Sequence, residues 1–153
     1  MKRHAILCVA GLLLAMPPAN AQRSFTLEQV MSAPFPSNLT AAKKNNRVAW
    51  ILNLEGRRNV WIAEGPGFAA RQITRYNEDD GQELSELRFS ADGNAIAYVR
   101  GDGKNTAGQV PNPTSNPAGA EQAVWIAAWA GGEPKRVDAG HSPEISSGGT
   151  IAY

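Results

Sequence analysis

The closest approach to a nucleophilic serine motif in this chain is Gly140-His141-Ser142-Pro143-Glu144. A hydrolase nucleophile would lie in G-x-S-x-G, on a sharp turn between a strand and a helix. Here Glu144 replaces the last glycine, Pro143 follows the serine directly, and no helical pattern comes after it. His141 is the only histidine after position 21, so a Ser-His-Asp triad and a multi-histidine metal site both lack support. We predict no catalytic residue, metal or cofactor in this chain, and we interpret Ser142-Pro143 as the start of a turn.

A second candidate is the acidic run Glu78-Asp79-Asp80, which Glu83 and Glu86 follow. Carboxylates grouped in this way can bind a cation. The spacing lacks the D-x-D-x-D-G pattern of a calcium loop. The alternative is a solvated loop in which Asp80-Gly81 forms a turn, as most charge runs are. Asp79 and Asp80 are the candidate binding residues.

Four tryptophans can stack on sugars or bases: Trp50, Trp61, Trp125 and Trp129. Trp125 and Trp129 are four positions apart, and an even separation places them on one face of a strand with Ala127 between them. We favour packing inside the fold over a stacking platform for these residues.

The start of the chain, residues 1–21, matches the three regions of a secretory signal peptide. Lys2-Arg3-His4 is basic, residues 5–16 are apolar, and residues 19–21 form a small-x-small cleavage site after two prolines. We predict cleavage after Ala21 and a secreted or periplasmic protein that is not attached to a membrane. A retained N-terminal anchor is the alternative.

Cleavage at this site changes the charge and the cysteine content. It removes Lys2 and Arg3 but no acidic residue, which turns a small excess of basic residues into a small excess of acidic ones. It also removes Cys8, the only cysteine. No basic patch then supports nucleic-acid binding, and no disulfide can form. Packing alone must stabilise the exported chain.

The elements that position these residues are predicted from an internal repeat. Val-Trp-Ile-Ala occurs at Val60–Ala63 and again at Val124–Ala127. A pattern of β-branched residue, alanine and aromatic residue occurs at residues 48–50, 96–98 and 151–153. Short β-prone stretches alternate with turn formers throughout. A repeat of this kind indicates a repeated structural unit.

One unit is longer than the other. The interval from Ile96 to Val124 is more than twice the equivalent interval from Val48 to Val60. The surplus falls in residues 101–122, which are rich in Gly, Pro, Asn and Ser and lack an apolar period, as a loop insertion would be. Without this insertion the repeat is about 40–48 residues, the length of a propeller blade.

The sequence therefore predicts an all-β fold, an incomplete β-propeller with two four-stranded blades and the start of a third. Blade one covers about residues 36–75, blade two about 84–139, and the third begins within 142–153. Val-Trp-Ile-Ala is the third strand of each blade, and residues 86–90 form an inner strand that lines the channel. A short helix precedes the blades, capped by Thr26 and Gln29 and stopped by Pro34.

Four segments carry a family resemblance that extends over residues 25–153: FTLEQVMSAPFPSNLTAA, EDDGQELSELRFSADGNAIAYVRGDG, PNPTSNPAG and GGEPKRVDAGHSPEISSGGTIAY. Together they resemble the N-terminal part of secreted bacterial serine peptidases of the prolyl-oligopeptidase family, of the dipeptidyl aminopeptidase and acylaminoacyl peptidase type (S9). FSADGNAIAYV is also similar to the periplasmic TolB-type propeller repeat, except that Ala91 stands where proline is usual.

The resemblance implies a propeller that restricts access to an α/β-hydrolase domain with the catalytic Ser, Asp and His. It also implies that the acidic run lies between blades one and two beside the central channel, where Asp79 and Asp80 would attract the free amino terminus of a peptide or bind a cation. Because two blades and part of a third cannot close a ring, we expect residues 1–153 to be a fragment of a longer protein. Its partners would be that hydrolase domain and the peptide substrate. The alternatives are a TolB-like periplasmic module that binds protein partners without being an enzyme, and a short protein that oligomerises into a ring.

Overall fold

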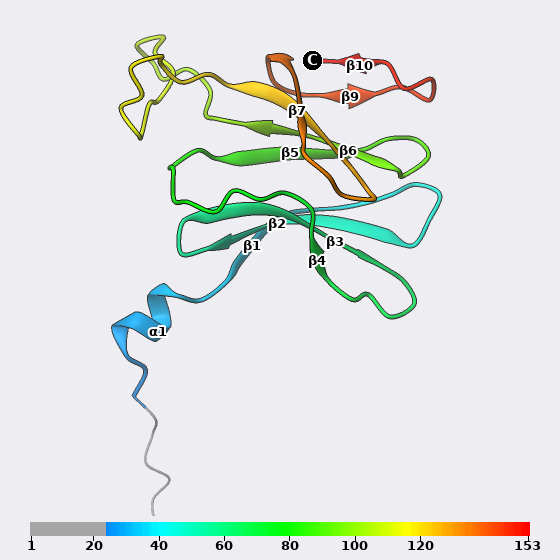
Figure 1. Ribbon diagram of the computed structural model, residues 1–153, viewed down its shortest axis with the longest axis horizontal. Coiled ribbons are helices and arrows are strands. Elements are labelled where there is room, and N and C mark those ends of the chain that lie inside the picture. The colour runs from blue at the N-terminus through cyan, green and yellow to red at the C-terminus, as the bar shows by residue number, and fades with distance from the viewer. Residues whose placement is uncertain (1–23) are drawn as a thin grey trace, which may run out of the picture.

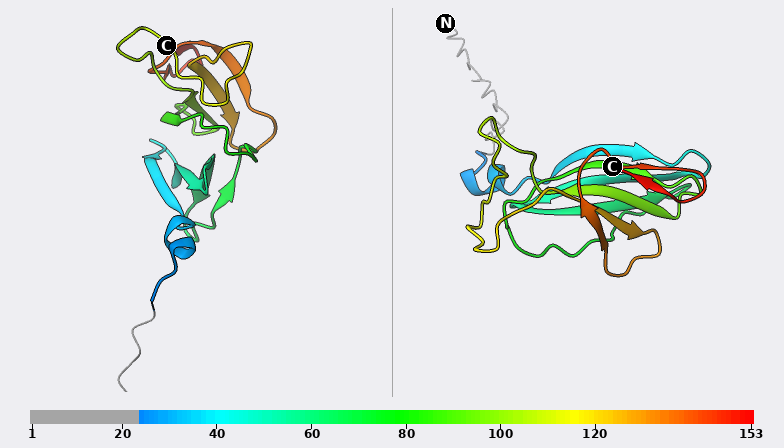
Figure 2. Two further views of the ribbon diagram at one scale, coloured as in Figure 1. Left: turned by 90° about the vertical axis from the view of Figure 1, so that its left-hand side faces the viewer. Right: turned by 90° about the horizontal axis from the view of Figure 1, so that it is seen from above.

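The computed structural model describes residues 24–153. The predicted signal peptide, residues 1–21, lies outside this range. Helix α1 (Leu27–Met31) begins with the expected capping box, in which Thr26 accepts from the Gln29 N–H and Gln29 accepts from the Thr26 N–H. The helix lies outside the sheets, and none of its residues is buried (Figure 2). Within the described residues no helix has the length and apolarity needed to cross a membrane.

The rest of the described chain forms three antiparallel sheets in chain order (Figure 1). The first sheet has the order β1 (Phe35–Ala41), β2 (Arg47–Leu54), β3 (Arg57–Glu64) and β4 (Arg71–Gln72). The second has the order β5 (Leu84–Phe89), β6 (Ala95–Arg100), β7 (Ala123–Ala128) and β8 (Lys135–Ala139). The third consists of β9 (Glu144–Ile145) and β10 (Ile151–Ala152). The prediction of an all-β fold is confirmed, and none of these sheets closes on itself.

The sequence repeat corresponds to equivalent places in the first two sheets. Val-Trp-Ile-Ala lies on the third strand of each, β3 and β7. Trp61 faces Trp50 across the first sheet, and Trp125 faces Tyr98 across the second. The sheets differ most between their second and third strands. Glu55-Gly56 make a tight turn with positive φ in the first, and the insertion of residues 101–122 replaces that turn in the second.

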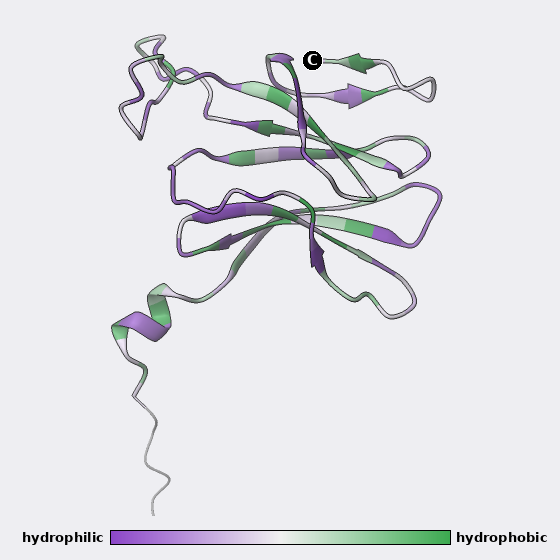
Figure 3. Cartoon of the chain, viewed as in Figure 1, coloured by the Kyte–Doolittle hydropathy of each residue, from purple (hydrophilic) through white to green (hydrophobic). Residues whose placement is uncertain are grey.

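The core lies between the first and second sheets, because alternate residues of each strand face the neighbouring sheet. The first sheet and the residues next to it contribute Ala49, Ile51, Val60, Ile62 and Ile73. The second sheet contributes Leu84, Leu87, Ile96, Tyr98 and Ala127. Hydrophobic residues accordingly lie on the strands, whereas the long β6–β7 connection is largely hydrophilic (Figure 3). Burial of each Val, Leu or Ile side chain contributes roughly 1.5–3 kcal/mol, and here that burial requires both sheets.

The first strands of successive sheets lie side by side, β1 beside β5 and β5 beside β9. Bulges in β1 and β5 follow Ser37 and Ser85, and the next residue of each strand has positive φ: 53° at Asn38 and 56° at Glu86. The Asn38 Oδ1 accepts from the Glu86 N–H at 3.3 Å. The Glu86 carboxylate in turn accepts from the N–H of Ser142, whose φ is 54°. These two bonds join the three sheets in series along one edge.

Candidate functional site

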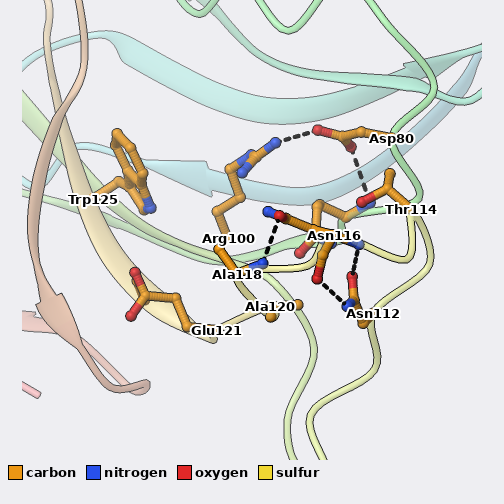
Figure 4. Close-up of a pocket in the computed structure, with 12 residues that line it drawn as sticks. Asp80, Arg100, Asn112, Thr114, Asn116, Ala118, Ala120, Glu121 and Trp125 are labelled. Carbon is orange, nitrogen blue, oxygen red and sulfur yellow. Dashed lines mark hydrogen bonds and ion pairs between the residues drawn. The ribbon is translucent and has the colours of Figure 1, made fainter.

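A polar cavity of about 550 Å³ lies at one end of the second sheet. Two connections form its walls, the one from β4 to β5 and the insertion between β6 and β7. The insertion rests on Gly81, where an added Cβ would lie 2.6 Å from the Cβ of Pro113 and where φ is +66°. A side chain at this position would push the two walls apart. The residues that line the cavity are Asp80, Gln82, Arg100, Asn112, Thr114, Asn116, Ala118, Gly119, Ala120, Glu121, Ala123 and Trp125 (Figure 4).

Asp80 and Arg100 form an ion pair across the floor of the cavity (Figure 4). Arg100 is the last residue of β6, and its guanidinium carbon lies 4.6 Å from the ring centroid of Tyr76. The other oxygen of Asp80 accepts from the Gln82 N–H at 3.0 Å. Both oxygens of the carboxylate are therefore held in place by the fold.

Two asparagines shape the wall that the insertion provides. Asn112 accepts from the Asn116 N–H at 2.9 Å and donates to the Asn116 carbonyl at 2.9 Å. Asn116 accepts from the Ala118 N–H at 3.0 Å. These are local side chain–backbone bonds of the kind that replace regular secondary structure in loops. They give the long connection a defined path along the cavity, where Thr114 is also a lining residue.

The end of the insertion and strand β7 add a carboxylate and an aromatic ring to the cavity lining. Both oxygens of Glu121 accept from the Arg136 guanidinium, at 2.7 and 2.9 Å. The hydrogen bond from Arg136 lowers the pKa of the Glu121 carboxyl, so this group stays ionised near neutral pH. The half-buried Trp125 lies beside it on β7 (Figure 4). The cavity thus combines two arginine-bound carboxylates, amide groups and an indole ring.

The structure separates the two candidate acids from one another. Asp80 lines the cavity, whereas Asp79 lies 3.6 Å from Arg58 beside the β2–β3 turn. Glu83 also pairs with Arg58, at 2.9 Å. Adjacent residues of a turn point in different directions, so the acidic run is divided between the two sheets.

Glu121 and Arg100 are site residues that the sequence did not single out, and Trp125, for which the sequence favoured packing inside the fold, lines the cavity. The available signal was the unusual length of the insertion, which is the segment that brings Glu121 to the cavity. Spacing alone could not identify these residues. Arg100 on β6 approaches the start of β7 only because the two strands pair across the long insertion.

Ser142 and His141 lie outside this cavity. The His141 Nδ1 is 3.0 Å from the Ser142 Oγ, both side chains are exposed, and the Ser142 backbone N–H binds Glu86. Pro143 follows in the segment before β9. Among the described residues no group of three or more His, Cys, Asp or Glu is placed to hold a metal ion.

No protein-family model matches the chain, and no curated protein matches it.

Proposed function

We propose that this chain is a non-catalytic propeller segment of an exported serine peptidase and that it gates and orients peptide substrates. The observation that carries the proposal is the serial stack of equivalent sheets, joined through Asn38, Glu86 and Ser142 along their first strands. Radial repetition of four-stranded sheets around inner strands is how a propeller is built. The peptidase assignment rests on the family resemblance of residues 25–153, and the catalytic hydrolase domain would lie elsewhere in the full-length protein.

The cavity supports a role in holding the amino-terminal end of a peptide. An ammonium group can donate to the lone pairs of the Asp80 carboxylate that Arg100 and the Gln82 N–H leave open, in a cavity that Trp125 also lines. The Asn112 amide is bonded through both its oxygen and its nitrogen within the insertion. The amide nitrogen of Asn116, which also lines the cavity, is therefore the group that can donate to a carbonyl of the first peptide bond. Because Arg100 and Arg136 neutralise Asp80 and Glu121, the cavity offers an ammonium group acceptor atoms rather than a net negative charge.

Calorimetric titration of the purified chain with short peptides tests this role. A tetrapeptide with a free amino terminus should bind, and its acetylated form should bind at least about fivefold more weakly, since one charge-assisted contact is lost. Asp80→Asn should weaken binding of the free peptide by a similar factor. Asp79→Asn is the matched control, because Asp79 lies outside the cavity. Equal affinity for both peptides, or an equal loss in both variants, would count against the site.

The peptidase context is tested separately by the coding sequence downstream of codon 153. Further blade repeats followed by G-x-S-x-G on a strand-to-helix turn would support it. Blade repeats without that motif would favour the TolB-like binding module instead. The chain itself should not hydrolyse dipeptidyl or acyl-peptide substrates, and turnover that a serine-directed inhibitor blocks would contradict its assignment as non-catalytic.

A further inference from the structure

The cavity at the end of the second sheet has a polar half and an apolar half, and the proposed function uses mainly the polar one. Asp80 and Asn116 belong to the polar half, where they would bind the amino group and the first carbonyl of a peptide. Glu121 lies near the apolar half, but both of its oxygens are bound by Arg136. The other residues of the apolar half come from the end of the insertion and the start of β7: Ala118, Gly119, Ala120, Ala123 and Trp125.

Trp125 both packs against the core and lines the cavity. Strand pairing places Trp125 opposite Tyr98 and Ala123 opposite Arg100. Residues directly opposite one another in a sheet share a face, and Tyr98 marks this face as the one turned toward the first sheet. The cavity lining takes no residue from β1–β4. The apolar half therefore continues the core beyond the part of the second sheet that the first sheet covers.

Arg100 lies between the two halves. In the view of Figure 4, Trp125 lies on one side of its side chain and Asn116 on the other, and its guanidinium is turned toward Asp80. The methylene stem of an arginine is apolar although its end is charged. A ligand group that passes from Asp80 toward Trp125 therefore crosses the apolar part of Arg100 and leaves the ion pair intact.

The first residue of a peptide has three groups that can reach these walls. Its α-carbon carries the amino group, the carbonyl group and the side chain in three different directions. When the amino group donates to Asp80 and the carbonyl group accepts from Asn116, the side chain must point away from both, and the wall on that side is the apolar one. Three contacts around one tetrahedral carbon also distinguish its mirror-image forms, because only one form places the side chain on that wall.

We propose that the apolar half of the cavity binds the side chain of the first residue of a peptide and selects a large apolar one, aromatic above all. The alanines and the glycine leave room that a large side chain fills, and an aromatic ring gains a favourable contact with the indole of Trp125. A charged side chain would be desolvated there without a partner. The cavity, at about 550 Å³, is in the size range of ligand sites. The inference rests on the proposed binding of a peptide amino terminus and names the class of peptide.

Calorimetric titration with tetrapeptides that differ only in the first residue tests this selection. A peptide that begins with L-phenylalanine should bind about tenfold or more tightly than one that begins with L-alanine, because it buries more apolar surface. A peptide that begins with D-phenylalanine has the same charge and apolar area, yet it should bind about fivefold or more weakly than the L form. Equal affinity for the L-phenylalanine and L-alanine peptides would overturn the inference. The proposed function would still stand in that case if acetylation weakened binding, whereas failure of every peptide to bind would overturn both.

Two alanines of the insertion provide matched variants. Ala118→Leu fills part of the apolar half, so it should weaken binding of the L-phenylalanine peptide about fivefold or more and change binding of the L-alanine peptide by no more than about twofold. Ala107→Leu is the control, because Ala107 is exposed in the same insertion and does not line the cavity. Ala118 is also exposed, so both variants should fold, and circular dichroism checks this. An equal effect of the two substitutions on the L-phenylalanine peptide would overturn the inference.

Discussion

The hydroxyl groups of Tyr76 and Tyr98 lie 2.7 Å apart at the boundary between the first and second sheets. Tyr98 is fully buried on β6, and Tyr76 is half-buried in the connection after β4. Asn59 holds the backbone of Tyr76 through a donated bond of 2.9 Å and an accepted bond of 2.8 Å. Because Arg100 stacks on the Tyr76 ring and pairs with Asp80, this buried polar network links the core to the cavity.

Removal of the hydroxyl group should lower the free energy of unfolding more at Tyr76 than at Tyr98. Tyr76→Phe leaves the buried Tyr98 hydroxyl without its partner, and we expect a loss of about 1–3 kcal/mol in the free energy of unfolding. Tyr98→Phe removes the buried polar group itself and leaves the more accessible Tyr76 hydroxyl to water, so the loss should be about 0.5–1.5 kcal/mol. Urea denaturation of both variants measures the difference. A larger loss for Tyr98→Phe would show that the Tyr98 hydroxyl has another partner.

The Asp92 carboxylate in the β5–β6 turn should titrate far below an ordinary aspartate. Hydrogen bonds from the Ser90 hydroxyl and from the Asn94 backbone and side chain lower the pKa of Asp92 to about 2. A lowered pKa means that the folded state favours the ionised form. The stabilisation is therefore complete above the unfolded pKa of about 3.9 and is lost as the pH falls through about 2.

A carboxyl-detected NMR titration checks the Asp92 midpoint directly. Ser90→Ala should raise the midpoint, because it removes the largest single contribution to the shift. Ser115→Ala, in the exposed part of the insertion, is a control that should leave the midpoint unchanged. A midpoint near that of an ordinary aspartate in the wild-type chain would mean that the turn does not hold these hydrogen bonds in solution.

Arg47 joins the two four-stranded sheets from its place at the start of β2. Its guanidinium pairs with Glu64 at 2.9 Å, donates to the Gly93 carbonyl at 3.0 Å, and lies 4.3 Å from the ring centroid of Trp129. Arg47→Ala should cost about 2–3 kcal/mol of stability, because a charge-assisted bond and a cation–π contact are lost together. Arg47→Lys should recover only part of this, since lysine lacks the planar fork.

Arg57 provides the comparison for Arg47 within the same sheet. Its ion pair with Glu55 is exposed and joins residues of one turn, so Arg57→Ala should change stability by no more than about 0.5 kcal/mol. Thermal denaturation of the three variants at matched ionic strength measures both effects. Similar losses at Arg47 and Arg57 would show that Arg47 does not hold the sheets together.

The repeat predicted the strands well because its residues pack in the same way in both sheets. Val60 and Val124 are both fully buried, and each lies on the third strand of its sheet. The repeat could not predict that Asp80 lines the cavity whereas Asp79 lies outside it. The directions of these two side chains depend on the packing of the β4–β5 connection, at Gly81, against Pro113 of the insertion. It also missed the bonds at Asn38 and Glu86, which require bulges that no composition signal marks.

The Asn38 side chain accepts a hydrogen bond from the Glu86 N–H, so substitutions at Asn38 measure how much this bond contributes to joining the first two sheets. Asn38→Ala removes the acceptor and places alanine at a φ of 53°, so we expect a loss of about 1.5–3 kcal/mol. Asn38→Gly removes only the acceptor and suits the positive φ, which should limit the loss to about 1 kcal/mol. Asn38→Asp keeps an acceptor and should remain closest to the wild type. If glycine and alanine were equally destabilising in urea melts, the backbone conformation at Asn38 would contribute nothing, and the side-chain bond alone would join the strands.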